Sequence, residues 1–221
     1  TVLVPVSNMY FDQAYSKDTD EPGFYWGSYT DTYAAFSFLP LNMFKMQQPT
    51  KRGKVLSNGY LHKKEVLTAA GVKNVCGIEG SLFSETIKGG GELEYLLFPK
   101  MLGLAERAWA SGFVMPDDTN LAVKNRTLEK WEVFANLLGQ RELGRLSKKG
   151  VDYRVPPVGY KVVNGLLSCN NVFPGPQVMV EFDNGKFKKY QEPVPLDHVK
   201  AVFVQDGNGR RGLVSTIDKV K

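Results

Sequence analysis

The stretch GSLFSETIKGGGELEYLLFPKMLGLAERAWASG, from Gly80 to Gly112, decides the fold class of the chain. It places an apolar run that ends in Ser84 and Glu85 directly before a glycine-rich turn and a long amphipathic helix. In α/β barrels a strand delivers polar groups to its carboxyl end, a helix follows, and catalytic groups lie at those strand ends. The stretch therefore predicts a barrel-type βα unit with Glu85 as a candidate site residue.

Two buried strands are predicted in the first part of the chain. Apolar residues at 2–6 and at 74–83 are typical of such strands, although the first contains Pro5. Residues 13–60 between them are rich in Gly, Pro, Asp, Asn and aromatic residues. A loop of that length inside a domain is usually functional.

Apolar residues at helical spacing predict three helices, at about 63–70, 92–111 and 126–148. Gly71 should end the first helix. Pro99 should kink the second or divide it in two, because proline removes a backbone donor from the helix interior.

The composition changes after Gly150, where β-type patterns replace helical ones. Alternating residues predict strands near 178–182, 199–204 and 213–217, and Asp183-Asn184-Gly185 predicts a hairpin turn. Residues 151–221 therefore predict a small antiparallel β domain, a sandwich, entered through a linker or first turn at Pro156-Pro157. No cluster of titratable groups is evident there. A structural appendage and a sugar-binding accessory domain both stay open.

Composition argues against several classes of function. The 221 residues are 43% hydrophobic with a formal net charge of +5, and no apolar run approaches the ~18 residues of a membrane span. The densest basic stretch, residues 51–54, lacks the interleaved aromatic residues of nucleic-acid binding. Cys76 and Cys169 are predicted to be two buried free thiols.

Neither a metal site nor a bound cofactor is expected. His62 and His198 lie in different predicted domains, without a second ligand at useful spacing. Gly89-Gly90-Gly91 precedes a helix but lacks the following Lys-Ser/Thr of a phosphate-binding loop.

Candidate site residues follow both predicted strands. In strand geometry Tyr10 and Asp12 share a face, and so do Phe83 and Glu85. If the strands are parallel neighbours, a phenol, an aromatic face and two carboxylates meet at one rim. Aromatic faces and hydroxyl-binding carboxylates suit a sugar. Solvated strand ends are the alternative.

Three segments carry a family resemblance: LFSETIKGGGELEYLLFPKMLGLAERAWA (82–110), NMYFDQAYSKDTDEPGFYWGSYTDT (8–32) and WEVFANLLGQRELGRLSKKGVDYRVPPVG (131–159). They resemble family-20 glycoside hydrolases, the β-N-acetylhexosaminidases, and most closely the bacterial chitobiases. The resemblance implies that residues 1–150 are the last two βα units of a (β/α)8 TIM barrel. Residues 151–221 would be the C-terminal immunoglobulin-like β domain.

The resemblance also implies site roles and a reaction. Tyr10 matches the tyrosine that hydrogen-bonds the acetamido oxygen of the substrate, and Asp12 and Glu85 match carboxylates that hold sugar hydroxyls. Trp26 matches the tryptophan that stacks on the sugar beyond the scissile bond. The implied chemistry is hydrolysis of terminal β-linked N-acetylglucosamine with retention, assisted by the substrate's own acetamido group.

Two departures from the family pattern matter. Phe83 stands where the family usually has tryptophan in the wall of the acetamido pocket. The His-x-Gly-Gly-Asp-Glu motif that carries the general acid is absent, and the Asp20-Glu21 pair is followed by Pro22-Gly23 instead.

With about 150 residues and two strands where a barrel needs about 250 residues, the chain resembles a C-terminal fragment, inactive alone. Its partners would be an N-acetylglucosamine oligosaccharide and the missing barrel part or other chains. The family implies an extracytoplasmic location. A non-catalytic carbohydrate-binding or scaffolding protein is the alternative.

Overall fold

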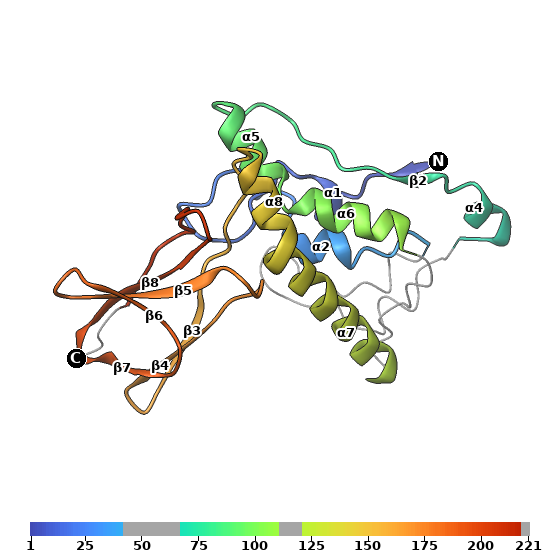
Figure 1. The fold of residues 1–221 in the computed structure, drawn as a ribbon. Coiled ribbons are helices and arrows are strands. Elements are labelled where there is room, and N and C mark those ends of the chain that lie inside the picture. Colours follow the sequence, from blue (N-terminus) through green and yellow to red (C-terminus); the bar gives the residue numbers. More distant parts are fainter. Residues whose placement is uncertain (42–66, 111–120, 218–221) are drawn as a thin grey trace. The chain divides into compact units, whose positions relative to one another are not determined.

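The computed structural model describes residues 1–41, 67–110 and 121–217 (Figure 1). Contacts divide the chain into two compact units, Thr1–Glu132 and Val133–Lys221. His62, the basic stretch at 51–54, and much of the loop predicted at 13–60 lie outside the described residues.

Two short parallel strands open the first unit. β1 (Val2–Leu3) pairs with β2 (Gly77–Ile78), so the parallel arrangement expected of neighbouring barrel strands is confirmed. Both strands are shorter than predicted. The first gives way to a helical turn, α1 (Val6–Met9), which begins directly after Pro5 and which the apolar pattern did not reveal.

The two helices that flank the undescribed part of the long loop are short and capped by side chains. In α2 (Thr32–Phe36) the Asp31 carboxylate accepts from the Ala34 amide at 2.7 Å. In α4 (Ala69–Lys73) the Thr68 hydroxyl accepts from the Gly71 amide at 3.1 Å. The predicted end of a helix at Gly71 is wrong, because Thr68 caps the start of the helix there. Residues 63–66 of that prediction lie outside the described part.

Pro99 divides the second predicted helix in two, as expected. α5 (Gly90–Leu97) ends before Phe98-Pro99, and α6 (Lys100–Trp109) begins after it. α6 packs against α2, and a Cβ at Gly103 would lie 2.6 Å from the carbonyl oxygen of Thr32. The close approach buries an apolar core of Met9, Phe11, Ala35 and Phe38, against which Leu3, Val4, Ile78, Leu82, Leu97 and Leu104 pack.

The third predicted helix begins earlier than expected and is interrupted by a π-helical turn. α7 (Leu121–Leu137) runs into a π-helical turn (Leu138–Glu142) and then α8 (Leu143–Lys148). Leu138, Leu143 and Leu146 are buried in the second unit. The chain then turns at Gly150, whose φ is +75°.

Two antiparallel sheets complete the second unit, as the predicted antiparallel domain requires. One has the strand order β3-β4-β7, the other β6-β5-β8-β9. The strands are β3 (Gly159–Val163), β4 (Leu166–Asn170), β5 (Gln177–Phe182), β6 (Phe187–Lys189), β7 (Val194–Pro195), β8 (Val199–Gln205) and β9 (Ser215–Thr216). A short 3-10 helix (Leu196–His198) precedes β8.

One hairpin of this unit was predicted and another was missed. The turn at Asp183-Asn184-Gly185 joins β5 to β6, as expected. The β3–β4 hairpin turns at Asn164 (φ 51°) and Gly165 (φ 72°), and this Asn-Gly pair is the sequence signal that could have identified it. Pro156-Pro157 leads into β3 within a largely buried segment, so it is not an exposed linker.

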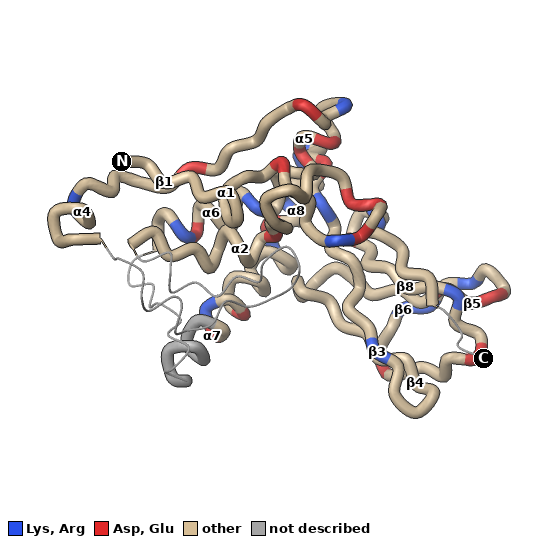
Figure 2. The backbone as a smooth tube through the Cα atoms, turned by 180° about the vertical axis from the view of Figure 1, so that it is seen from behind, with Lys and Arg blue, Asp and Glu red and all other residues tan. Residues whose placement is uncertain are grey.

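Charged residues of both signs are interspersed along the described chain (Figure 2). No described helix combines the length and the apolar character needed to span a membrane.

Candidate functional site

Backbone pairing places Tyr10 beside the segment that leads to Glu85. The amide of Phe11 donates to the Ser81 carbonyl at 2.7 Å, and the amide of Ser81 donates to the Met9 carbonyl at 2.8 Å. Tyr10 and Ser81 thereby form a parallel bridge that resumes the β1–β2 pairing after the helical turn. The two predicted strand ends thus lie side by side, but residues 11–12 form a turn and not a continued strand.

Three aromatic rings from three segments meet at this bridge. The ring of Tyr10 lies 5.2 Å from that of Phe83 and 6.1 Å from that of Trp26, the latter in an edge-to-face arrangement. Trp26 is 55% exposed and Phe83 is 44% exposed, so the cluster presents ring surface outward. It offers a ligand an apolar wall in which the phenol ring contacts both other rings.

The two candidate carboxylates differ in their surroundings. Glu85 is exposed, whereas Asp12 is 1% exposed, and its Oδ1 has no hydrogen-bond partner among the described residues. Burial raises the pKa of Asp12, and the nearby Glu85 charge raises it further, against a backbone hydrogen bond and the Lys100 charge, which lower it. Asp12 is thus a buried acceptor with unused capacity beside a second carboxylate.

The loop that carries Trp26 is tied to the backbone around Asp12. The amide of Phe24 donates to the Asp12 carbonyl at 2.8 Å, and that of Ala14 donates to the Phe24 carbonyl at 2.6 Å. The buried Gln13 side chain accepts through Oε1 from the Gly27 amide at 3.2 Å. These bonds connect the loop that carries Trp26 to the backbone segment that carries Asp12.

A buried lysine binds the backbone on either side of Asp12, and the sequence analysis did not identify it. Lys100, the first residue of α6, is 0% exposed and donates to the carbonyls of Phe11 and Gln13. The only signal in the sequence is a cation at the start of an apolar helix.

The Asp20-Glu21 pair does not form a catalytic dyad. Asp20 is exposed on the surface. Glu21 is buried and accepts from the Tyr95 hydroxyl at 2.7 Å and from the Ser16 hydroxyl at 3.3 Å. Its carboxylate therefore joins the loop to α5.

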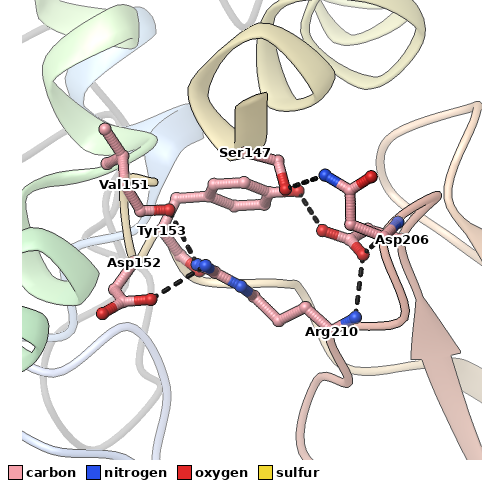
Figure 3. A network of polar contacts seen from close by, with 7 residues as sticks. Ser147, Val151, Asp152, Tyr153, Asp206 and Arg210 are labelled. Atoms are coloured by element: carbon pink, nitrogen blue, oxygen red, sulfur yellow. Dashed lines mark hydrogen bonds and ion pairs between the residues drawn. The ribbon is translucent and has the colours of Figure 1, made fainter. Parts of the chain in front are cut away.

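The second unit contains a polar network that contradicts the prediction of no titratable cluster there (Figure 3). The Tyr153 hydroxyl donates to Asp206 at 2.5 Å, and the Arg210 guanidinium contacts the Asp152 carboxylate at 2.8 Å and the Val151 carbonyl at 2.9 Å. Burial, followed by the hydrogen bond to Asp206, raises the pKa of Tyr153. Because these contacts join residues more than 50 positions apart, spacing could not reveal the network, which fixes residues 151–153 to the turn after β8.

The described residues contain no group of three His, Cys, Asp or Glu side chains arranged to hold a metal ion. His198 is exposed in the second unit. Both cysteines are free, but the prediction that both are buried is wrong, since Cys76 is exposed and Cys169 is half-buried. Burial raises the pKa of the Cys169 thiol to about 11.

Two family descriptions match the chain. Residues 1–112 match "Glycosyl hydrolase family 20, catalytic domain", and residues 142–214 match "Chitobiase/beta-hexosaminidase C-terminal domain". The two matches together cover the candidate site and most of the antiparallel sheets.

Individual relatives match nearly the whole chain. An N,N'-diacetylchitobiase from Vibrio harveyi is 33% identical over 231 residues, which cover 99% of this chain and 26% of the relative. A beta-hexosaminidase from Vibrio vulnificus is 29% identical over 96% of this chain and 27% of its own length. The chain therefore spans about a quarter of these curated relatives.

Among solved structures, an inactive mutant of a GH20 exo-β-N-acetylglucosaminidase from Vibrio harveyi is similar at a TM-score of 0.38 and 20% identity. The match covers 66% of this chain and 17% of that one.

Proposed function

Because this chain belongs to glycosyl hydrolase family 20, we propose that it forms the C-terminal part of a β-N-acetylhexosaminidase of chitobiase type. Residues 1–150 would supply the last two units of a (β/α)8 barrel, and residues 151–221 an immunoglobulin-like sandwich. The substrate would be chitobiose or a chitooligosaccharide with a terminal β-linked N-acetylglucosamine. The names of the relatives support this substrate class.

One observation carries the proposal: the Tyr10–Ser81 bridge brings together three aromatic rings and two carboxylates from distant segments. Aromatic faces cover the apolar patches of a pyranose, and carboxylates accept hydrogen bonds from its hydroxyls. A site of this composition favours a neutral sugar over a phosphorylated or acidic ligand, because two carboxylates close together repel an anion.

In the proposed reaction the substrate's acetamido oxygen attacks the anomeric carbon and forms an oxazolinium ion. The Tyr10 hydroxyl would donate to that oxygen as its charge changes. A donor that is already in place needs no reorganisation during the reaction, which makes such electrostatic stabilisation effective. The edge and tilted contacts of Trp26 and Phe83 would keep the phenol ring in place for this role.

The remaining candidate residues would bind the substrate. Asp12, with one unused carboxylate oxygen, and Glu85, at the exposed rim, would hold sugar hydroxyls. Trp26 would stack on the sugar beyond the scissile bond, and its exposed face is consistent with that contact. Phe83 would form part of the acetamido pocket wall, with less area than tryptophan.

The proposal assigns the general acid to residues outside the 221 of this chain. None of the five candidate residues would donate a proton to the leaving oxygen from its assigned position, and the His-x-Gly-Gly-Asp-Glu motif is absent. We therefore expect no turnover of 4-nitrophenyl N-acetyl-β-glucosaminide by the chain alone. Turnover by the purified chain would contradict this assignment.

The function itself is tested in a chimeric chitobiase, in which this chain replaces the matching quarter of the Vibrio harveyi N,N'-diacetylchitobiase. We expect hydrolysis of the aryl glycoside, and loss of that activity in a Glu85→Ala chimera. The matched control is Glu79→Ala, which removes a carboxylate from the same segment before the Tyr10–Ser81 bridge. A folded but inactive chimera that still binds chitobiose would favour the non-catalytic carbohydrate-binding alternative.

A further inference from the structure

Lys100 is fully buried, and its position demands an explanation. A buried ammonium loses its hydration and persists only where other groups replace the lost hydrogen bonds. Its Nζ donates to the Phe11 carbonyl at 2.9 Å and to the Gln13 carbonyl at 2.6 Å. The same nitrogen lies 3.9 Å from the centre of the Tyr15 ring, whose face attracts a cation.

The two carbonyls that Lys100 binds flank Asp12. The carbonyl between them, that of Asp12 itself, accepts from the Phe24 amide at 2.8 Å. Three successive carbonyls of this turn are therefore held, two by one side chain and the third by the loop that carries Trp26. Rotation of the peptide group before Asp12 would break a bond to the ammonium, and rotation of the peptide group after it would break the bond from the Phe24 amide.

The Lys100 charge also acts on the Asp12 carboxylate. Burial and the Glu85 charge disfavour the ionised form of Asp12, whereas the Lys100 charge and a backbone hydrogen bond favour it. Lys100 is the cation among the groups that act on this carboxyl.

We propose that Lys100 is a positioning residue, which fixes the Tyr10–Gln13 turn through its carbonyls and so holds Asp12 where it binds substrate. The inference rests on the proposed function of Asp12, although the contacts of Lys100 stand independently of it. A merely structural lysine would affect stability alone, whereas a positioning lysine also changes how Asp12 binds and titrates.

Three variants separate charge, hydrogen bonding and packing. Lys100→Met keeps the length but removes both the charge and the donor, Lys100→Gln keeps a donor, and Lys100→Arg keeps the cation. Lys73→Met, at an exposed lysine of α4, is the control. If the methionine variant does not fold, the comparison of glutamine with arginine still separates charge from hydrogen bonding.

The first measurement is hydrogen exchange by mass spectrometry on the full 221-residue chain. Lys100→Met should accelerate exchange at the amides of Ala14 and Phe24, and Lys100→Arg should restore the native rate. Unchanged exchange in a folded methionine variant would overturn the proposal. This readout requires no enzymatic activity, so it decides the role of Lys100 even if the chimeric chitobiase proves inactive.

The second measurement is the pH profile of kcat/KM in the chimeric chitobiase. Lys100→Met should lower kcat/KM by about 10²-fold, as displacement of a substrate-positioning group does, mostly through KM. The acid limb should move to higher pH in the methionine and glutamine variants but not in the arginine or Lys73→Met variants, because loss of the cation raises the pKa of Asp12. An active chimera whose acid limb stays in place in all four variants would overturn the proposal.

Discussion

Asp12 combines near-complete burial with an oxygen that has no partner in the described chain. Buried polar groups usually have a hydrogen-bond partner, and an exception calls for an explanation. The sequence predicted Asp12 and Tyr10 as neighbours at the end of a strand, and the predicted proximity of Tyr10 to Phe83 is confirmed. It did not predict the helical turn before Tyr10, because four residues are too few to show a period.

The first prediction concerns pH and Asp12. Its pKa is raised in the folded chain, so the folded state binds the proton more tightly than the unfolded state does. Its contribution to stability is therefore greatest below the unfolded pKa of about 3.9 and is lost as the pH rises through the folded pKa. We expect Asp12→Asn to raise the melting temperature by an amount that grows as the pH rises above about 4. A difference from the native chain that stays constant with pH would contradict the raised pKa.

The second prediction concerns the Tyr10 hydroxyl in the chimeric chitobiase. Tyr10→Phe keeps the ring that contacts Phe83 and Trp26 but removes the donor. We expect kcat to fall by on the order of 10²–10³, as when one oxyanion-hole donor is lost. KM should change little, because the interaction belongs mainly to the transition state. The melting temperature should stay nearly constant.

The control for this experiment is Tyr160→Phe, which removes an exposed phenol hydroxyl on β3 of the second unit. A Tyr10→Phe enzyme with near-native kcat, or one whose main defect is stability, would remove Tyr10 from the catalytic residues. It would also weaken the placement of Asp12 and Glu85 beside it.

At the scale of elements, short sequence motifs correctly predicted a helix break and a hairpin turn. Pro99 divides its helix because the ring excludes a backbone donor, and Asp183-Asn184-Gly185 turns its hairpin because glycine accepts a positive φ. The Asn164-Gly165 turn carried the same type of signal. The helix at 69–73 could not be placed from apolar spacing, because the Thr68 cap fixes its start.

The third prediction concerns the π-helical turn before α8. A Cβ at Gly139 would collide with the carbonyl of Pro174, whereas a Cβ at Gly144, one turn further along, would meet open space. We expect Gly139→Ala to destabilise the second unit by about 1–3 kcal/mol, as overpacking does. Gly144→Ala, the matched control, should instead stabilise it by about 0.5–1 kcal/mol, because alanine favours the helix.

Urea denaturation of the two alanine variants checks this prediction. Equal changes in the free energy of unfolding would mean that the segment at Phe173–Pro174 gives way. The close approach of the π-helical turn to that segment would then contribute little to stability.

At the scale of the whole molecule, composition predicted a helical part followed by a β part, and the structure has both. The sequence could not predict which residues connect the end of α8 to the β part, because these contacts join residues that are far apart in the chain. Ser147 at the end of α8 accepts from Asn208, and Arg210 holds the carbonyls of Val151 and Tyr153. The Ser147–Asn208 bond joins residues that the composition assigned to different parts of the chain.

The last prediction follows from those contacts. Helical residues 133–148 belong to the same compact unit as the sheets, and Leu138, Leu143 and Leu146 among them are buried. Residues 133–221 should therefore fold alone, with a single cooperative thermal transition. Residues 151–221, cut where the composition changes, would lose these three leucines and the Ser147–Asn208 bond. We expect a lower melting temperature, exposed apolar surface and a broadened transition for the shorter piece, measured by circular dichroism and dye binding. Equal melting temperatures for the two pieces would show that the β part needs no helices. The boundary of the independently folding unit would then lie near residue 150.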